Sequence, residues 1–353
     1  CLHLIGTHER APSWAATYPN GEIDKVSLEE FKQYIAALVE RYDGDGRADA
    51  PNSPVINHWE LYNEPDGGDL LNDTTWGRKG DKYAEMLAAV YPVIKQANPN
   101  AKVLFGGIAY DWFTDDPKNP GPFVRSFLDD VLANGGGQYF DIMNIHAYPA
   151  FRPYWTDSGG PGLREKVEFV RKKLQDEYGL DKPFMITEDG WHSNAYIEHS
   201  STPEDQARYV VQLFTQSMAA EVDVMIYWLL YDLGDGYPYK SGLVKRVDDP
   251  VSPLAEKPAF QAYKVLSGLL SDAIFKRPLS QSEMKAPEME AYLFSDPKQS
   301  RSIYVAWLNP IDITAAESLR LPAESGTVWD IYGHATEVRD KDDGSNDGRI
   351  KIE

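Results

Sequence analysis

The sequence has one cysteine, no long apolar run and few basic residues for its length. Among its 353 residues, Cys1 alone can form neither an internal disulfide nor a cysteine-based metal site, and it leaves the cellular compartment undecided. No segment approaches the roughly 18 apolar residues of a membrane-spanning helix. Lys and Arg total 35 against 55 Asp and Glu, a net charge of −20. This charge argues against a nucleic acid or an anionic membrane as partner and leaves the oligomeric state open.

Motifs that define several other classes of site are also absent from the sequence. It contains no Gly-rich phosphate loop and no Gly-x-Ser-x-Gly nucleophile elbow. A metal-dependent barrel hydrolase could use several of the histidines, but no His-x-His pair or His-Glu-x-x-His helix is present. Bound zinc would support that alternative. The histidines concerned are His3, His8, His58, His146 and His192.

What is present is a regular alternation of short apolar strands and amphipathic helices over residues 1 to 271. Strands are expected at 2–6, 55–66, 102–108, 140–146, 184–188 and 222–230, with helices at 27–42, 81–97, 123–133, 163–178, 203–220 and 258–270. After residue 272 the helical period gives way to short strand-like runs separated by Pro, Gly, Asn and Asp. The pattern predicts an α/β fold, a (β/α)-barrel domain over 1–271, followed by a small antiparallel β-sandwich-like domain over 272–353.

Two glutamates end strands of this alternation. Glu64 follows the apolar run that begins at Val55, and Glu188 follows the run that begins at Phe184. A strand-end glutamate by itself is more often a salt-bridge partner than a catalyst. Because parallel strands of a barrel end at the same rim, however, the two carboxylates are expected to face each other there. A facing pair of carboxylates is the catalytic arrangement that most glycoside hydrolases use.

With these residues the sequence resembles the retaining glycoside hydrolases of clan A, the barrel enzymes that include families 5 and 39. Asn63-Glu64-Pro65 matches the motif that closes the fourth strand in the clan, and Thr187-Glu188 matches the end of the seventh. The resemblance covers about residues 1 to 271. It implies that Glu188 is the nucleophile, that Glu64 is the acid and then the base, and that no cofactor is required.

The resemblance also implies several sugar-binding residues. Asn63 would bind the sugar 2-hydroxyl, although adjacent strand residues point to opposite faces, so Asn63 and Glu64 can both reach the site only if the strand end is distorted. His146 and Tyr148 would bind sugar hydroxyls and orient the nucleophile. Trp228 would form the base of the first sugar site, and the peptide bond after it would be cis. Polar residues at a strand end remain the plainer interpretation of His146 and Tyr148.

Other aromatic residues could form further sugar subsites, because apolar sugar faces stack well on indole rings. For each of them, packing in the core or in a loop is at least as common. Among the candidates are Trp14, Trp112 and Trp191. A non-catalytic carbohydrate-binding protein would carry the same aromatic loops, but the presence of both glutamates favours a hydrolase acting on a carbohydrate.

An acidic loop precedes the first glutamate strand. Asp43, Asp45 and Asp49 are spaced as carboxylates are in calcium loops, with Gly44 and Gly46 permitting a tight turn. The bidentate glutamate of an EF-hand is missing. A possible structural calcium and a solvated turn are therefore both open interpretations.

The position of the two glutamates along the chain predicts that it is a fragment. Counted from Cys1, Glu64 falls on the second strand and Glu188 on the fifth, whereas the clan uses the fourth and the seventh. The same offset of two strands suggests a (β/α)8 barrel whose first two βα units are missing, which would leave the sheet open and the fragment poorly active. The strand-like run that starts at Arg349 is likewise expected to lack a partner.

Overall fold

The computed structural model describes residues 3–68, 75–110, 122–148, 162–195, 200–286, 288–309 and 317–353. They form two compact units, which are described separately below. The first comprises Cys1–Ala147 and Lys166–Glu188, and the second comprises Tyr148–Glu165 and Asp189–Glu353. A boundary between independent domains at residue 272 stays a prediction.

The strands of the first unit follow one another in chain order. A parallel sheet has the order β1-β2-β3, with β1 at Ile5–His8, β2 at His58–Leu61 and β3 at Lys102–Leu104. Isolated parallel bridges continue from the β3 segment to the β4 segment, and β4 and β5 are neighbours in a further sheet. β4 spans Met143–Ala147 and β5 spans Phe184–Asp189. Strands in this order, each followed by a helix, match the predicted strand/helix units.

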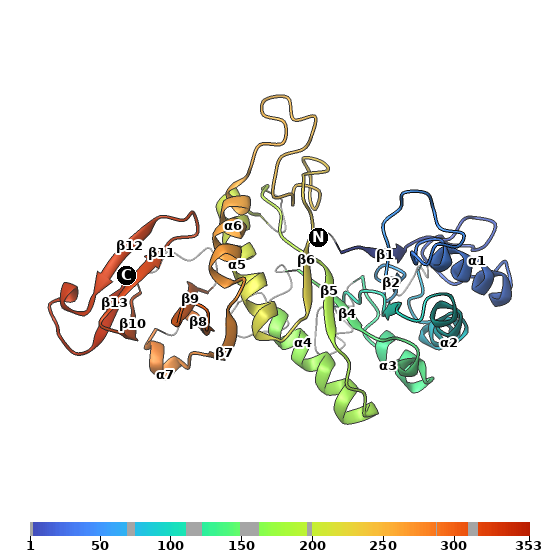
Figure 1. Ribbon diagram of the computed structural model, residues 1–353, viewed down its shortest axis with the longest axis horizontal. Coiled ribbons are helices and arrows are strands. Elements are labelled where there is room, and N and C mark those ends of the chain that lie inside the picture. Colours follow the sequence, from blue (N-terminus) through green and yellow to red (C-terminus); the bar gives the residue numbers. More distant parts are fainter. Residues whose placement is uncertain are drawn as a thin grey trace. The chain divides into compact units, whose positions relative to one another are not determined.

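In the first unit α1 packs against α2, and α2 against α3 (Figure 1). The helices of this unit are α1 at Leu28–Glu40, α2 at Gly80–Ala97, α3 at Phe127–Ala133 and most of α4 at Leu163–Lys172, which ends in a π-helical turn at Lys173–Glu177. α1 begins at a capping box, in which Ser27 and Glu30 bond each other's backbone N–H groups, a pairing that their spacing of three residues in the sequence indicates. No helix among the described residues is long and apolar enough to cross a bilayer.

An aromatic stack joins the helices of the first unit to the end of β2. Tyr62, Trp76 and Tyr83 meet edge to face with ring centroids 5.1 and 5.2 Å apart, and Tyr83 also meets Phe105 at 5.3 Å. The Tyr83 hydroxyl donates to the Leu61 carbonyl at 2.6 Å and accepts the Gly106 N–H at 3.1 Å. One buried side chain thereby fixes the backbone at the ends of two neighbouring strands.

Two helices and one strand come first among the elements that lie wholly in the second unit. α5 at Pro203–Ala219 starts at Thr202 with a capping box and a proline in its first turn, as the sequence predicts. β6 is at Val224–Tyr227 and α6 at Pro258–Leu270. α5 packs against α6, and a cluster around Leu266 and Phe294 joins these helices to the strands that follow.

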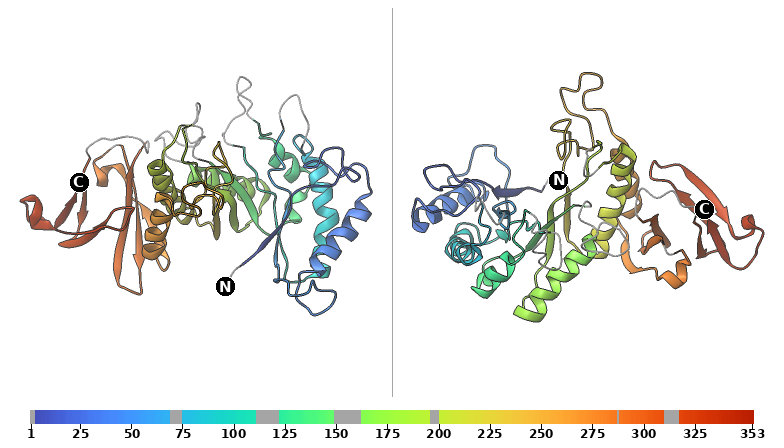
Figure 2. Two further views of the ribbon diagram at one scale, coloured as in Figure 1. Left: turned by 90° about the horizontal axis from the view of Figure 1, so that it is seen from above. Right: turned by 180° about the vertical axis from the view of Figure 1, so that it is seen from behind.

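Antiparallel strands make up the rest of the second unit (Figure 2). Three form the sheet β7-β8-β9, namely β7 at Ile274–Pro278, β8 at Met289–Asp296 and β9 at Arg301–Leu308. Two further pairs are β10 at Leu319–Pro322 with β13 at Arg349–Ile352, and β11 at Ser325–Trp329 with β12 at Ala335–Arg339. A short helix, α7, lies at Gln281–Met284.

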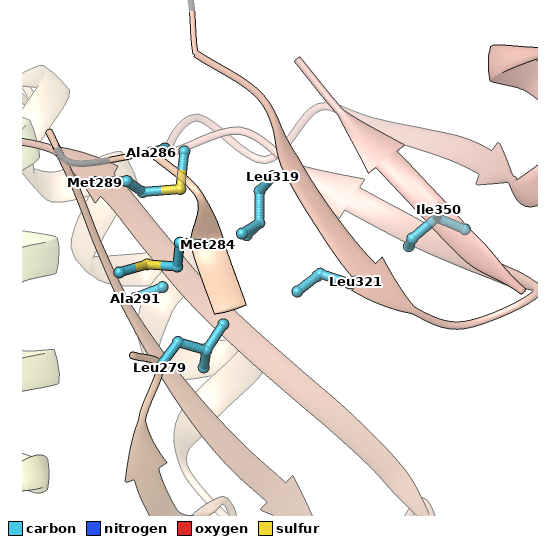
Figure 3. Close-up of a cluster of buried hydrophobic side chains, with 8 residues drawn as sticks. All are labelled: Leu279, Met284, Ala286, Met289, Ala291, Leu319, Leu321 and Ile350. Carbon is cyan, nitrogen blue, oxygen red and sulfur yellow. The ribbon is translucent and has the colours of Figure 1, made fainter. Parts of the chain in front are cut away.

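Apolar side chains from both sheets form one core in this region (Figure 3). Met284 and Ala291 of the α7–β8 segment pack with Leu319, Leu321 and Ile350 of the β10–β13 pair. Burial of these chains attaches the β10–β13 pair to the three-stranded sheet.

Several predicted boundaries were wrong. β2 begins at His58, not at Val55, because the Ile56 N–H bonds to the carbonyl of Tyr42 at the end of α1 and Val55 is 50% exposed. The strand at the C-terminal end does have a partner, since β13 pairs with β10. β7 and β12 were not predicted, as their exposed side chains give no clear alternation.

Candidate active site

The two strand-end glutamates lie close together in the first unit. Glu64 comes three residues after β2, and Glu188 is the fifth residue of β5. One carboxylate oxygen of each, together with a ring nitrogen of His146, lies within 4.8 Å of the others. The predicted proximity is therefore present.

The chain around Glu64 leaves regular strand geometry. Tyr62 and Glu64 have φ angles of 68° and 47°, in the left-handed region that residues other than glycine rarely adopt. Asn63 between them keeps one parallel bridge, to Gly107. The predicted distortion thus arises from two left-handed residues. Such strain persists only where the surroundings enforce it, and here the fully buried Tyr62 ring packs between His8 and Trp76, with centroids 5.0 and 5.1 Å away.

His146 contacts the Glu64 carboxylate directly. Its Nδ1 lies 3.0 Å from Glu64 Oε1, and its Nε2 lies 3.1 Å from the Thr187 hydroxyl oxygen. Burial by itself lowers the pKa of this imidazole, but the hydrogen bond and charge of Glu64, with the charges of Glu188 and Glu60, raise it to about 8. The surrounding carboxylates thus favour the protonated imidazole beside Glu64.

Gly107 makes room for the His146 ring. A Cβ atom at position 107 would lie 2.0 Å from His146 Nε2 and 2.3 Å from its Cδ2, far inside van der Waals contact. The φ angle of Gly107 is not in the left-handed region, so backbone conformation does not demand a glycine here. The close approach of the His146 ring does.

Glu60 is a site residue that the sequence did not suggest. It is the third residue of β2 and only 3% exposed. Its Oε1 accepts the Gly107 N–H at 3.1 Å, the Asn144 side-chain amide at 2.7 Å and the Thr187 hydroxyl at 3.2 Å. Burial raises the pKa of this carboxyl, with the nearby His146 and these donors partly opposing the rise. An acid between Trp59 and Leu61 in a buried strand was the available signal, because such an acid needs partners.

Two further buried charged residues lie in the same unit. Asp66 is fully buried, and its carboxylate accepts the backbone N–H groups of Ala109 and Tyr110, both at 2.9 Å for Oδ2. Burial, followed by the charge of Glu64, raises the pKa of Asp66 to about 7. Lys166 is 1% exposed, and its ammonium donates to the His146 carbonyl at 2.6 Å. Neither residue stands out in a helix or strand pattern.

Known proteins resemble the chain in sequence. Mannan endo-1,4-beta-mannosidase 2 of Arabidopsis thaliana is 27% identical over 185 residues, which are 50% of this chain and 40% of that protein. Mannan endo-1,4-beta-mannosidase 2 of Oryza sativa subsp. japonica is 25% identical over 177 residues, 47% of this chain and 37% of that protein. The chain thus matches well under half the length of these curated relatives. No family model matches it.

Solved structures resemble it in fold. A family 39 glycoside hydrolase from Bacteroides cellulosilyticus WH2 has a TM-score of 0.65 and 19% identity, over 95% of this chain and 61% of the other. The catalytic domain of xylanase C of family 30 from Talaromyces cellulolyticus has a TM-score of 0.52 and 14% identity, over 99% and 73%. The chain is thus similar in sequence to mannan endo-1,4-beta-mannosidases and in fold to glycoside hydrolases of families 39 and 30. The resemblance predicted from the sequence and the α/β, TIM-barrel type of fold are thereby confirmed.

The remaining predicted sugar-binding residues lie in different surroundings. In the second unit, Tyr148 and Trp228 are half-buried, and the peptide bond between Trp228 and Leu229 is cis, as predicted. Trp191 of that unit is 5% exposed and donates from its indole nitrogen to Ser201, which fits the packing alternative. Trp14 in the first unit is 71% exposed. The last candidate, Trp112, lies outside the described residues.

The acidic loop converges as the spacing predicts. Carboxylate oxygens of Asp43, Asp45 and Asp49 lie within 4.8 Å of one another. These carboxylates also accept backbone N–H groups of their own loop, such as that of Gly46 onto Asp49 at 2.8 Å. Both alternatives, a calcium loop and a self-capped turn, fit this arrangement.

The histidines give little support to a metal-dependent reaction. Within the described ranges, His146 is the one histidine that converges with two carboxylates. Each of its ring nitrogens already has a hydrogen-bond partner, at 3.0 and 3.1 Å. Burial lowers the pKa of His8, another of the candidates, to about 4.

Proposed function

We propose that this chain carries the catalytic pair of a retaining glycoside hydrolase. Glu188 is the nucleophile, and Glu64 is first the acid and then the base. The observation that carries the proposal is the approach of the two carboxylates to within 4.8 Å of each other and of His146. The sequence and fold relatives, all glycoside hydrolases, support the same reaction class.

The reaction proceeds in two balanced steps. Glu188 attacks the anomeric carbon and forms a glycosyl ester, while Glu64 gives its proton to the departing glycosidic oxygen. A water then attacks the same carbon, Glu64 takes a proton from that water, and Glu188 leaves as a carboxylate. His146, 3.0 Å from Glu64, holds the proton that the acid needs at neutral pH.

A plant-type polysaccharide is the proposed substrate. The relatives found by sequence are named mannan endo-1,4-beta-mannosidases, and one fold relative is a xylanase, so β-1,4-linked mannan is the first substrate to test and xylan the second. Asn63, His146, Tyr148 and Trp228 are the proposed contacts of the sugar at the cleavage point. Trp14, Trp112 and Trp191 are proposed for further sugars, with Trp14 supported by its exposure.

We further propose that β1 to β6 correspond to the third to eighth strands of a (β/α)8 barrel. The support is the position of Glu64 after β2 and of Glu188 in β5, two strands earlier in each case than in clan A.

Turnover of a panel of aryl β-glycosides and of soluble mannan and xylan by the full-length protein tests the catalytic proposal. Glu188→Gln should abolish turnover of every substrate, whereas Glu64→Ala should spare aryl glycosides whose leaving groups need no protonation. Glu29→Gln, an exposed change on α1, is the control and should leave turnover unchanged. NMR of the first product should show retained anomeric configuration. Equal losses on both substrate types for Glu64→Ala would refute its role, and binding without turnover would favour a carbohydrate-binding protein.

The acidic loop is proposed as a structural calcium site, separate from the chemistry. Support comes from the convergence of Asp43, Asp45 and Asp49 within 4.8 Å. Oxygen ligands of this kind suit calcium.

A further inference from the structure

A short chain of hydrogen bonds connects Glu60 to the far side of the His146 ring. The Thr187 hydroxyl lies at its centre, 3.2 Å from Glu60 Oε1, 3.1 Å from His146 Nε2 and 2.7 Å from the Asn144 side-chain nitrogen. These residues come from β2, β4 and β5. Because a hydroxyl has one proton to donate and two lone pairs, its three contacts cannot all have the same direction.

Two backbone N–H groups fix the direction of this chain. The Thr187 N–H donates to Asn144 Oδ1 at 3.1 Å, so the Asn144 amide nitrogen must be the end that points at Glu60 and at the Thr187 hydroxyl. The Gly107 N–H donates to Glu60 Oε1 at 3.1 Å, so this oxygen is an acceptor. A backbone N–H can only donate, which leaves no choice at either position.

The Thr187 hydroxyl therefore donates its hydrogen bond to Glu60. The hydroxyl already receives a hydrogen from Asn144, and Glu60 Oε1 offers it an acceptor. Its second lone pair then faces His146 Nε2, which has to be the donor in that contact. Nε2 then keeps its hydrogen. One further proton can lie either on His146 Nδ1 or on Glu64 Oε1, which are 3.0 Å apart.

We propose that Glu60 is a positioning residue. By accepting the hydrogen bond from the Thr187 hydroxyl, it fixes a hydrogen on His146 Nε2. The Nδ1 atom is then the ring nitrogen that donates a proton to Glu64 or accepts one from it. The pair then has two forms with the same number of protons, imidazolium with Glu64 carboxylate and neutral imidazole with Glu64 carboxylic acid. Moving one proton across 3.0 Å converts one form into the other. As an account of how Glu64 is kept protonated for the first step, the inference rests on the proposed glycosidase function.

The opposite tautomer would not serve. If Thr187 donated to Nε2, a neutral His146 would carry its hydrogen on Nδ1 and hold Glu64 as a carboxylate. Transfer of that hydrogen to Glu64 would require an imidazolate, which is out of reach near neutral pH. Glu60 prevents this tautomer because it accepts the hydrogen bond that the Thr187 hydroxyl would otherwise donate to Nε2.

The charges that face His146 come from three elements. Glu60 lies in β2 with Glu64 just beyond it, Glu188 lies in β5, and Lys166 of α4 donates to the His146 carbonyl at 2.6 Å. The three carboxylates favour the protonated imidazole and outweigh its burial. Removing the charge of Glu60 should therefore weaken proton binding by the Glu64–His146 pair.

Side-chain nitrogen NMR of the whole chain labelled with ¹⁵N-histidine tests the tautomer without any substrate. The His146 signals are identified by their absence from His146→Gln. Above pH about 8 the neutral ring of the unchanged protein should carry hydrogen on Nε2 and none on Nδ1, and Thr187→Ser, which keeps the hydroxyl, should give the same pattern. Hydrogen on Nδ1 in the unchanged protein would overturn the inference.

Glu60→Gln separates the charge from the hydrogen bonds. Its carboxamide oxygen can still accept from Gly107, Asn144 and Thr187, so the Nε2-protonated tautomer should remain. The His146 titration, and the alkaline limb of kcat/KM for mannan, should move to lower pH by about one unit, the scale of a lost neighbouring charge. A purely structural role would lower kcat without moving that limb, and an unmoved titration would refute the charge effect. If the full-length protein turns over no glycoside at any pH, the proposed function fails while the NMR result still decides the role of Glu60.

Discussion

Adding one methyl group at Gly107 should disable the site more than its size suggests. In Gly107→Ala the new Cβ would lie 2.0 Å from His146 Nε2, where ordinary contacts begin at 3.4 Å. The ring would have to retreat by more than about 1 Å, a displacement that can lower catalysis about 100-fold. It cannot retreat toward Nδ1, because Glu64 Oε1 is already 3.0 Å away. The contact between His146 and Glu64 should therefore break.

The same crowding should also cost stability. Forcing an extra carbon into a packed interior typically costs about 1–3 kcal/mol. Thermal unfolding followed by circular dichroism measures this cost, and hydrolysis of an aryl β-glycoside and of mannan measures the effect on rate. We expect a folded but less stable protein, with turnover of mannan reduced about 100-fold.

Gly268→Ala is the matched control. Gly268 lies inside α6, and no heavy atom lies within 4 Å of its added Cβ. Alanine in a helix interior is favoured over glycine by about 0.5–1 kcal/mol, so this variant should be as stable as the parent or more so, with unchanged turnover. If Gly107→Ala kept both the parent rate and the parent His146 titration, the packing argument for the site would be wrong.

Three further predictions follow from local features. Ser27→Ala removes the capping box of α1 and should lower stability by about 1 kcal/mol in thermal denaturation, whereas an unchanged midpoint would show that the cap is dispensable. Burial raises the pKa of Asp66 to about 7, so this carboxyl binds a proton more tightly in the folded than in the unfolded protein. The free energy of unfolding should therefore fall as pH rises from about 4 to about 7 and stay level above pH 7. Asp66→Asn should flatten this part of the pH profile relative to the parent. Calorimetry should detect calcium binding that is lost when Asp43, Asp45 and Asp49 are all changed to Asn, and no binding to the parent would leave the loop a self-capped turn.

Local signals in the sequence determined the helices and the approach of the two strand-end glutamates. The start of α1 could be predicted because the capping residue and its partner lie three positions apart in the chain, and that of α5 because a capping threonine directly precedes a proline. Glu64 and Glu188 could be predicted because each ends an apolar run, and parallel strands bring their ends to one edge. These inferences need only neighbours along the chain and the rule for parallel strands.

Tertiary structure alone decided what surrounds that pair. Glu60 has its partners 47, 84 and 127 positions away, at Gly107, Asn144 and Thr187, so no window of sequence contains them together. The need for glycine at position 107 likewise arises from the ring of His146, which belongs to another strand. Strand boundaries failed for the same reason: whether Val55 joins a sheet depends on which neighbour its segment meets, and here the segment is tied to the end of α1. Periodicity reports which residues are apolar, whereas hydrogen-bond partners and close approaches are set by strands that meet only after folding.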